Sequence, residues 1–135
     1  MLADESVQGL GPDGWAGAVV VTAARWEADR VVAEANNGGA MVGEVLRAAD
    51  CGLAPKLVHA TRGKVARAEP VALLFEAGRA FFCGAFPKLE DELSGLQAGG
   101  GCEGPTRSPD RADACVWAMS ELAQQRASVP RVRAL

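Results

Sequence analysis

Short apolar runs alternate along this chain with longer segments of helical periodicity. The run in 29–35, DRVVAEA, has no apolar–polar alternation, which is typical of a strand in the interior of a sheet. The spacing of apolar residues predicts strands over 2–7, 29–35, 55–60 and 79–84, and helices over 12–27, 40–49, 64–77, 87–96 and 109–125. Because strands that alternate with helices form parallel sheets covered by those helices, the pattern predicts an α/β fold with a largely parallel sheet.

The composition is that of an ordinary globular protein. Hydrophobic residues make up 49% of the 135 positions and charged residues 23%. A net charge of −3 argues against a surface that is basic throughout, although it permits a local basic patch. The start MLADESVQG does not resemble a signal peptide, and no apolar run approaches the ~18 residues of a membrane span. We therefore expect a cytoplasmic protein without a membrane segment, with one domain over 1–126 and a tail over 127–135.

The cysteine pattern disfavours a zinc site. Cys51, Cys83, Cys102 and Cys115 are widely spaced and form no CxxC pair, and His59 is the single histidine. We interpret the cysteines as reduced thiols that serve mainly in packing. The chain also has neither a GxxxxGK[ST] loop for ATP nor a GxSxG nucleophile motif.

Glu34 ends the second predicted strand, and two asparagines and two glycines follow it. Ligands of open α/β sheets bind outside the carboxyl ends of the strands, and glycines let a backbone approach closely. A solvated acid before a flexible turn has the same sequence pattern. Taken alone, this segment favours the solvated acid, and a ligand-binding role is the alternative.

Asp110 and Asp113 lie three residues apart at the start of the last predicted helix, so they share one helix face. The helix dipole favours acids in this position, and many such acids are only caps or dipole partners. Asp113 is nevertheless surrounded by Ala112, Ala114 and Cys115, which favours a position facing a cleft. With the acid at the strand end, these carboxylates would suit Mg²⁺ or Mn²⁺ and a two-metal hydrolysis of phosphodiesters.

A basic cluster lies before and within the third predicted helix. Arg62, Lys64 and Arg67 fall within six residues of an otherwise acidic chain. Such a cluster is suited to contacts with nucleic-acid phosphates, and a solvated helix start is the equally plain alternative.

Four segments in the same order resemble the C-terminal nuclease domain of the large terminase subunit, the DNA-packaging protein of tailed phages and gene transfer agents. They cover nearly the whole chain and are LADESVQGLGPDGWA at 2–16, VVAEANNGGAMVGEVLR at 31–47, GKVARAEPVALLFEAGRAFFCGAFPKLEDEL at 63–93 and SPDRADACVWAMSEL at 108–122. Each motif is weak alone, but the ordered set is specific.

This resemblance implies an RNase H-like fold, in which helices flank a central mixed sheet, and a two-metal endonuclease that cuts concatemeric double-stranded DNA. By its position in the motifs, Glu34 matches the metal ligand at the strand end and Asp110 the ligand on the final helix. Asp113 lies on the same face, and either of the two aspartates could coordinate Mg²⁺ or Mn²⁺. The implied partners are double-stranded DNA, the ATPase domain, the small terminase subunit and the portal protein.

The chain also departs from the family pattern. The family's first catalytic aspartate lies on a strand upstream of the segment matched here, and Asp4 belongs to the third-strand motif instead. We therefore expect a domain without its first two strands that cuts DNA poorly or not at all on its own, and whose exposed sheet edge is open to pairing with a second copy. The alternatives are a non-catalytic remnant or interaction module of the packaging complex, and a resolvase-like nuclease that acts on branched DNA.

Overall fold

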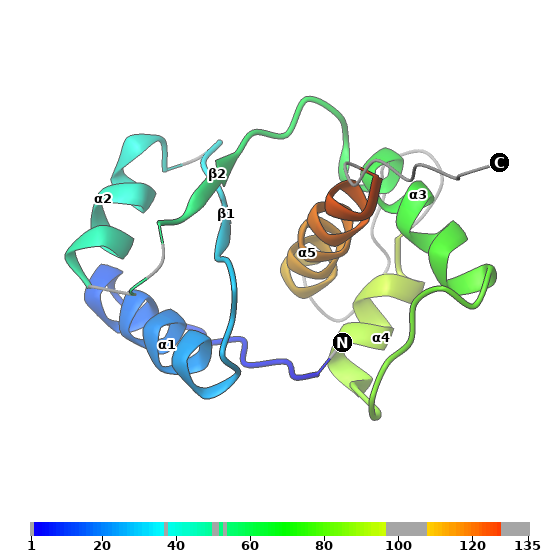
Figure 1. Cartoon of the computed structure of the whole chain (residues 1–135), viewed down its shortest axis with the longest axis horizontal. Coiled ribbons are helices and arrows are strands. Elements are labelled where there is room, and N and C mark those ends of the chain that lie inside the picture. The colour runs from blue at the N-terminus through cyan, green and yellow to red at the C-terminus, as the bar shows by residue number, and fades with distance from the viewer. Residues whose placement is uncertain (1, 37, 50–51, 53, 97–107, 128–135) are drawn as a thin grey trace, which may run out of the picture. The chain divides into compact units, whose positions relative to one another are not determined.

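The computed structural model describes residues 2–36, 38–49, 52, 54–96 and 108–127 (Figure 1). Its contacts divide the chain into two units, Glu5–Thr61 and a second unit that joins Met1–Asp4 to Arg62–Leu135. The helices and strands, in chain order, are α1 Pro12–Arg25, β1 Val32–Glu34, α2 Ala40–Ala48, β2 Lys56–Val58, α3 Lys64–Glu76, α4 Pro87–Ser94 and α5 Asp110–Ala127.

The unit formed by residues 5–61 contains a parallel pair of strands. β1 and β2 pair in the register Val32↔Lys56, Ala33↔Leu57 and Glu34↔Val58, and α2 connects them. Two parallel strands joined through a helix form the βαβ unit of α/β folds. The α/β prediction and the parallel direction are therefore confirmed.

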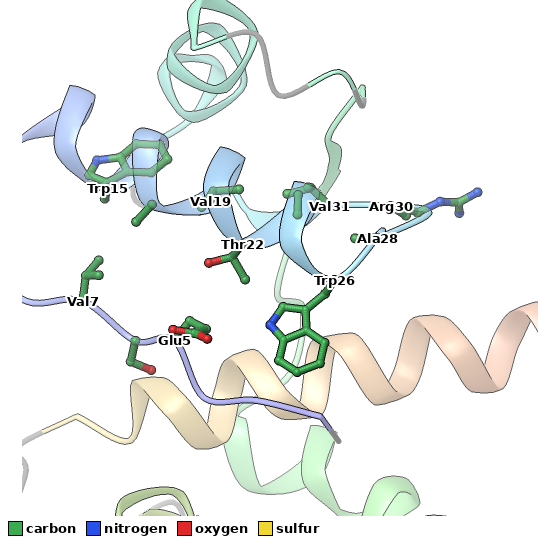
Figure 2. Close-up of a pocket in the computed structure, with 12 residues that line it drawn as sticks. Glu5, Val7, Trp15, Val19, Thr22, Trp26, Ala28, Arg30 and Val31 are labelled. Atoms are coloured by element: carbon green, nitrogen blue, oxygen red, sulfur yellow. The ribbon is translucent and has the colours of Figure 1, made fainter. Parts of the chain in front are cut away.

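α1 belongs to the same unit and contributes its apolar face. Pro12 stands in the first turn, where its missing N–H costs nothing, and the helix buries Ala16 and Ala23. Other residues of the helix border a pocket of about 420 Å³, with Glu5 and Val7 on its far side from the helix (Figure 2). The pocket is lined by Glu5, Ser6, Val7, Trp15, Ala18, Val19, Thr22, Ala23, Trp26, Ala28, Arg30 and Val31.

The predicted strand over 2–7 is wrong, because this segment forms no strand. Glu5 and Val7 line the same pocket as Val31, which leads into β1. A strand needs a neighbouring backbone at about 4.8 Å, and in the part of the chain that the structure describes β1 pairs with β2.

The second unit packs α3 and α4 against α5. Its core cluster contains Leu89 of α4 with Ala112 and Cys115 of α5. The partly buried side chains packed against this cluster are Phe82, Phe86, Leu93, Leu96 and Met119. α4 and α5 therefore share one apolar centre, to which the start of α5 contributes Ala112.

The predicted strand over 79–84 is also wrong, because these residues carry no strand. Gly78 adopts a φ of +61°, and the Arg79 N–H then bonds back to the Leu74 carbonyl at 2.8 Å, which ends α3 in a left-handed turn. The Phe82 ring packs against Phe75 at a centroid distance of 4.8 Å. The apolar residues that suggested a strand thus serve helix packing.

Candidate functional site

α3 and α5 bring together two bases and two acids that the sequence placed far apart. Lys64 and Arg67 lie on the first turn of α3, and Asp110 and Asp113 lie on the first turn of α5. Residues three apart on a helix share a face, so each helix presents its pair to the other. The predicted shared face of the two aspartates is confirmed, because Lys64 contacts both of them.

Arg67 and Asp113 form the inner part of this cluster. Arg67 Nη2 lies 2.5 Å from Asp113 Oδ1, and each side chain is only 11% exposed. The guanidinium also lies 4.9 Å from the centroid of the Trp117 ring, and Arg67 Nη1 donates to the backbone carbonyl of Arg62 at 2.7 Å. An arginine held by a carboxylate, a ring and a carbonyl has little freedom, so it fixes the orientation of Asp113.

Lys64 and Asp110 form the outer part of the cluster. Lys64 Nζ lies 3.1 Å from Asp110 Oδ1, 3.8 Å from Asp113 Oδ2 and 3.1 Å from Ser108 Oγ. A hydrogen bond from the Ser108 hydroxyl, followed by the nearby Lys64 ammonium, lowers the pKa of the Asp110 carboxyl below its ordinary value. Two carboxylate oxygens and a hydroxyl therefore surround the Lys64 ammonium, which offsets the charge of the two acids.

Glu92 is a residue of this region that the sequence analysis missed. Its side chain is 2% exposed, and its carboxylate accepts the backbone N–H groups of Arg111 and Ala112 at 2.8 Å and 3.1 Å. These are donors of the first turn of α5, which a capping side chain normally satisfies. Glu92 of α4 thus caps α5 from another helix and fixes where its first acids lie.

The guanidinium of Arg111 neutralises the buried Glu92. Arg111 Nη1 lies 3.0 Å from Glu92 Oε1, and Arg111 Nε lies 3.2 Å from Asp4 Oδ2. Asp4 therefore forms a second ion pair with Arg111, in the first turn of α5. The available sequence signal for Glu92 was its position three residues after Leu89, on the apolar face of an amphipathic helix.

Glu34 is the last residue of β1, as predicted, and it is partly buried. It belongs to the unit formed by 5–61, whereas the two aspartates belong to the other unit. Beyond it, Asn36 pairs with Ala60 through two hydrogen bonds, Ala60 N–H to Oδ1 at 2.9 Å and Nδ2–H to the carbonyl at 3.3 Å. Gly39 then adopts a φ of +52° and starts α2.

Arg62, the third base of the predicted phosphate-binding cluster, is exposed, and its backbone carbonyl accepts from Arg67.

Within the described residues, no three His, Cys, Asp or Glu side chains form a group that could hold a metal ion. In the same part of the chain, no helix combines the length and the hydropathy that crossing a bilayer requires.

Comparison with known proteins gives one family. The family model of the terminase RNaseH-like domain matches residues 1–122. Searches of curated proteins and of solved structures give no match. Because the matched residues make up nearly the whole chain of 135, the chain belongs to the terminase RNaseH-like domain family.

Proposed function

We propose that this chain is the nuclease domain of a terminase large subunit and acts on double-stranded DNA during packaging. The observation that carries the proposal is the family match over residues 1–122, which includes both the strand-end acid Glu34 and the acidic start of α5. The paired aspartates and the adjoining bases of α3 support the proposal. Such an activity uses acids to bind a metal ion and bases to contact phosphates.

In this proposal Asp110 and Asp113 bind Mg²⁺ or Mn²⁺, and Glu34 is a further candidate ligand because of its position in the family motif. Held there, such a cation would supply a Lewis acid that lowers the pKa of a water molecule and offsets negative charge on the phosphate. Arg67 keeps Asp113 in one orientation. Arg62 and Lys64 contact the DNA backbone, where their charges offset those of the phosphates.

Calorimetric titration with Mn²⁺ tests the proposal. We expect binding that is lost in Asp110→Ala or Asp113→Ala and retained in Asp91→Ala, which removes an exposed acid from α4. Absence of Mn²⁺ binding to the unaltered chain and to every variant would contradict the proposed function.

DNA cleavage is the second measurement. In an assay of plasmid nicking with Mn²⁺, we expect slow nicking at most from the isolated chain. Among the described residues, Asp110 and Asp113 come together without a third acid beside them. Rapid nicking that Glu34→Ala abolishes would show that this chain already contains a complete site. Faster cleavage of four-way junctions than of linear duplexes would indicate a resolvase-like nuclease.

A non-catalytic interaction module of a packaging complex is the second candidate function. It is favoured by the ion pairs themselves, because Lys64 and Arg67 neutralise both aspartates and link α3 to α5. Under this alternative the aspartates stabilise the unit and bind no metal. Loss of thermal stability in Asp113→Ala, without any Mn²⁺ binding to the unaltered chain, would support it.

A further inference from the structure

We propose that the Asp110 carboxylate occupies a phosphate-binding position of this chain, so that duplex DNA must displace it before Lys64 can contact the DNA backbone. This inference rests on the function proposed above and adds an autoinhibitory contact to it. The contact lies within one unit of the structure, between the start of α3 and the start of α5.

An oxyanion already lies at this position, and it comes from the chain itself. Asp110 Oδ1 accepts a hydrogen bond from Lys64 Nζ at 3.1 Å and another from the Ser108 hydroxyl at 2.6 Å. The two donor atoms are themselves 3.1 Å apart. An ammonium and a hydroxyl are among the groups that proteins use to bind the phosphate oxygens of DNA. The carboxylate oxygen of Asp110 therefore stands in for a phosphate oxygen.

The ion pair between Lys64 and Asp110 is open to exchange. The Asp110 side chain is 81% exposed, and the Lys64 side chain is 33% exposed and ends in a flexible four-carbon stem. Ion pairs in contact with water contribute little to stability, so a phosphate can replace the carboxylate at low cost. Arg62, which is exposed and lies two residues before Lys64, can contact the same stretch of backbone.

The neighbouring ion pair between Arg67 and Asp113 does not exchange in this way. Each of its side chains is only 11% exposed, and the Arg67 guanidinium lies over the Trp117 ring. Its separation would disturb the packing of α3 on α5. The two ion pairs therefore have different roles, because the inner pair joins the helices and the outer pair covers a DNA contact.

The affinity for a fluorescently labelled DNA duplex, measured by anisotropy in the presence of EDTA, tests the inference. Asp110→Asn should bind about fivefold more tightly than the unaltered chain, because a carboxylate that holds the ammonium is removed. Asp91→Asn removes the same charge from an exposed position of α4 and should change the affinity less than about twofold. Circular dichroism verifies that both variants fold as the unaltered chain does.

A double-variant cycle separates a covered lysine from general repulsion between Asp110 and DNA. In the Lys64→Gln background, Asp110→Asn should gain no more affinity than Asp91→Asn does, because the lysine that it would release is gone. The salt dependence gives a second readout. The slope of log affinity against log salt concentration should be about one unit shallower for Lys64→Gln/Asp110→Asn than for Asp110→Asn, since one phosphate contact is lost.

The outcomes separate this inference from the proposed function. If the unaltered chain binds the duplex and Asp110→Asn binds with equal or lower affinity, the autoinhibitory contact is wrong and the function stands. An equal gain from Asp110→Asn with and without Lys64 would also overturn the contact, because Asp110 would then act only by repulsion. If neither the unaltered chain nor Asp110→Asn binds DNA, both proposals are wrong. Binding by Asp110→Asn alone would support the contact in its strongest form.

Discussion

Arg67 and Asp113 form an ion pair in which each side chain keeps only 11% of its surface exposed. Removing one partner of such a pair leaves a charge in poorly solvated surroundings, whereas removing both can cost little. The pair is therefore a sensitive point in the packing of α3 on α5, whatever the aspartate binds.

Arg67→Met should lower the free energy of unfolding by about 2–3 kcal/mol, because it leaves the Asp113 carboxylate with the more distant Lys64 alone. The double variant Arg67→Met/Asp113→Asn should lose less than the sum of the two single variants. Urea titration followed by tryptophan fluorescence measures both. Arg79→Met, at an exposed position just beyond α3, is the matched control. If the double variant loses as much free energy of unfolding as the two single variants together, Arg67 and Asp113 are not coupled.

Glu92→Ala should lower the free energy of unfolding by about 3 kcal/mol, since it uncaps α5 and leaves Arg111 without its buried partner. Thermal and urea unfolding provide the measurement, with Asp91→Ala as the exposed neighbour on α4. Glu92→Gln keeps an acceptor for the two N–H groups but removes the charge, so its loss should be smaller. An equal loss in all three variants would contradict the capping role.

Ser108→Ala should raise the pKa of Asp110 toward the ordinary value of about 3.9, because the hydroxyl is the main cause of the lowered pKa. A depressed carboxyl pKa adds stability above the unfolded value, and this stability is lost as the pH falls through the folded pKa. Since the Asp110 side chain is 81% exposed, the contribution to stability is small.

The pKa itself is therefore the better readout for this serine. Titration of the Asp110 carboxyl carbon by NMR measures it, and Ser94→Ala on α4 provides a control at an exposed position. An unchanged Asp110 pKa in Ser108→Ala would assign the effect to Lys64 instead.

Gly38→Ala should destabilise the turn between β1 and α2 by about 1–2 kcal/mol, because overpacking costs energy that local movement only partly relieves. A Cβ at this position would lie 2.4 Å from Val42 Cγ2, and valine is stiff about χ1. Val42→Ala in the Gly38→Ala background should restore part of the loss in thermal unfolding. If Val42→Ala instead lowers the stability of Gly38→Ala further, the clash with Val42 is not the cause of the loss.

The elements that depend on local chemistry were predictable from the sequence. The start of α1 at Pro12 and the glycine-led start of α2 follow from residues within a few positions, and Glu34 ends β1 as its apolar run indicated. The pairing of Asp110 with Asp113 on one face follows from helix periodicity alone.

The features that depend on distant partners were not predictable. Residues 2–7 and 79–84 have the composition of strands, but a strand exists only where another backbone lies beside it. Nor could spacing show that Lys64 contacts Asp110, 46 residues further along the chain. The sequence places Glu92, an acid, on the apolar face of α4. It does not show that the partners of Glu92 lie at the start of α5.

The cap that Glu92 provides has a consequence for how this unit folds. A helix capped by its own neighbouring residues can begin to form in an otherwise unfolded chain, whereas the first turn of α5 gains its cap only after α4 has docked. Nucleation of α5 is thereby tied to a contact across 20 residues of sequence. Variants that destabilise α4 should therefore also slow the formation of α5. Both helices should form in one kinetic phase of refolding.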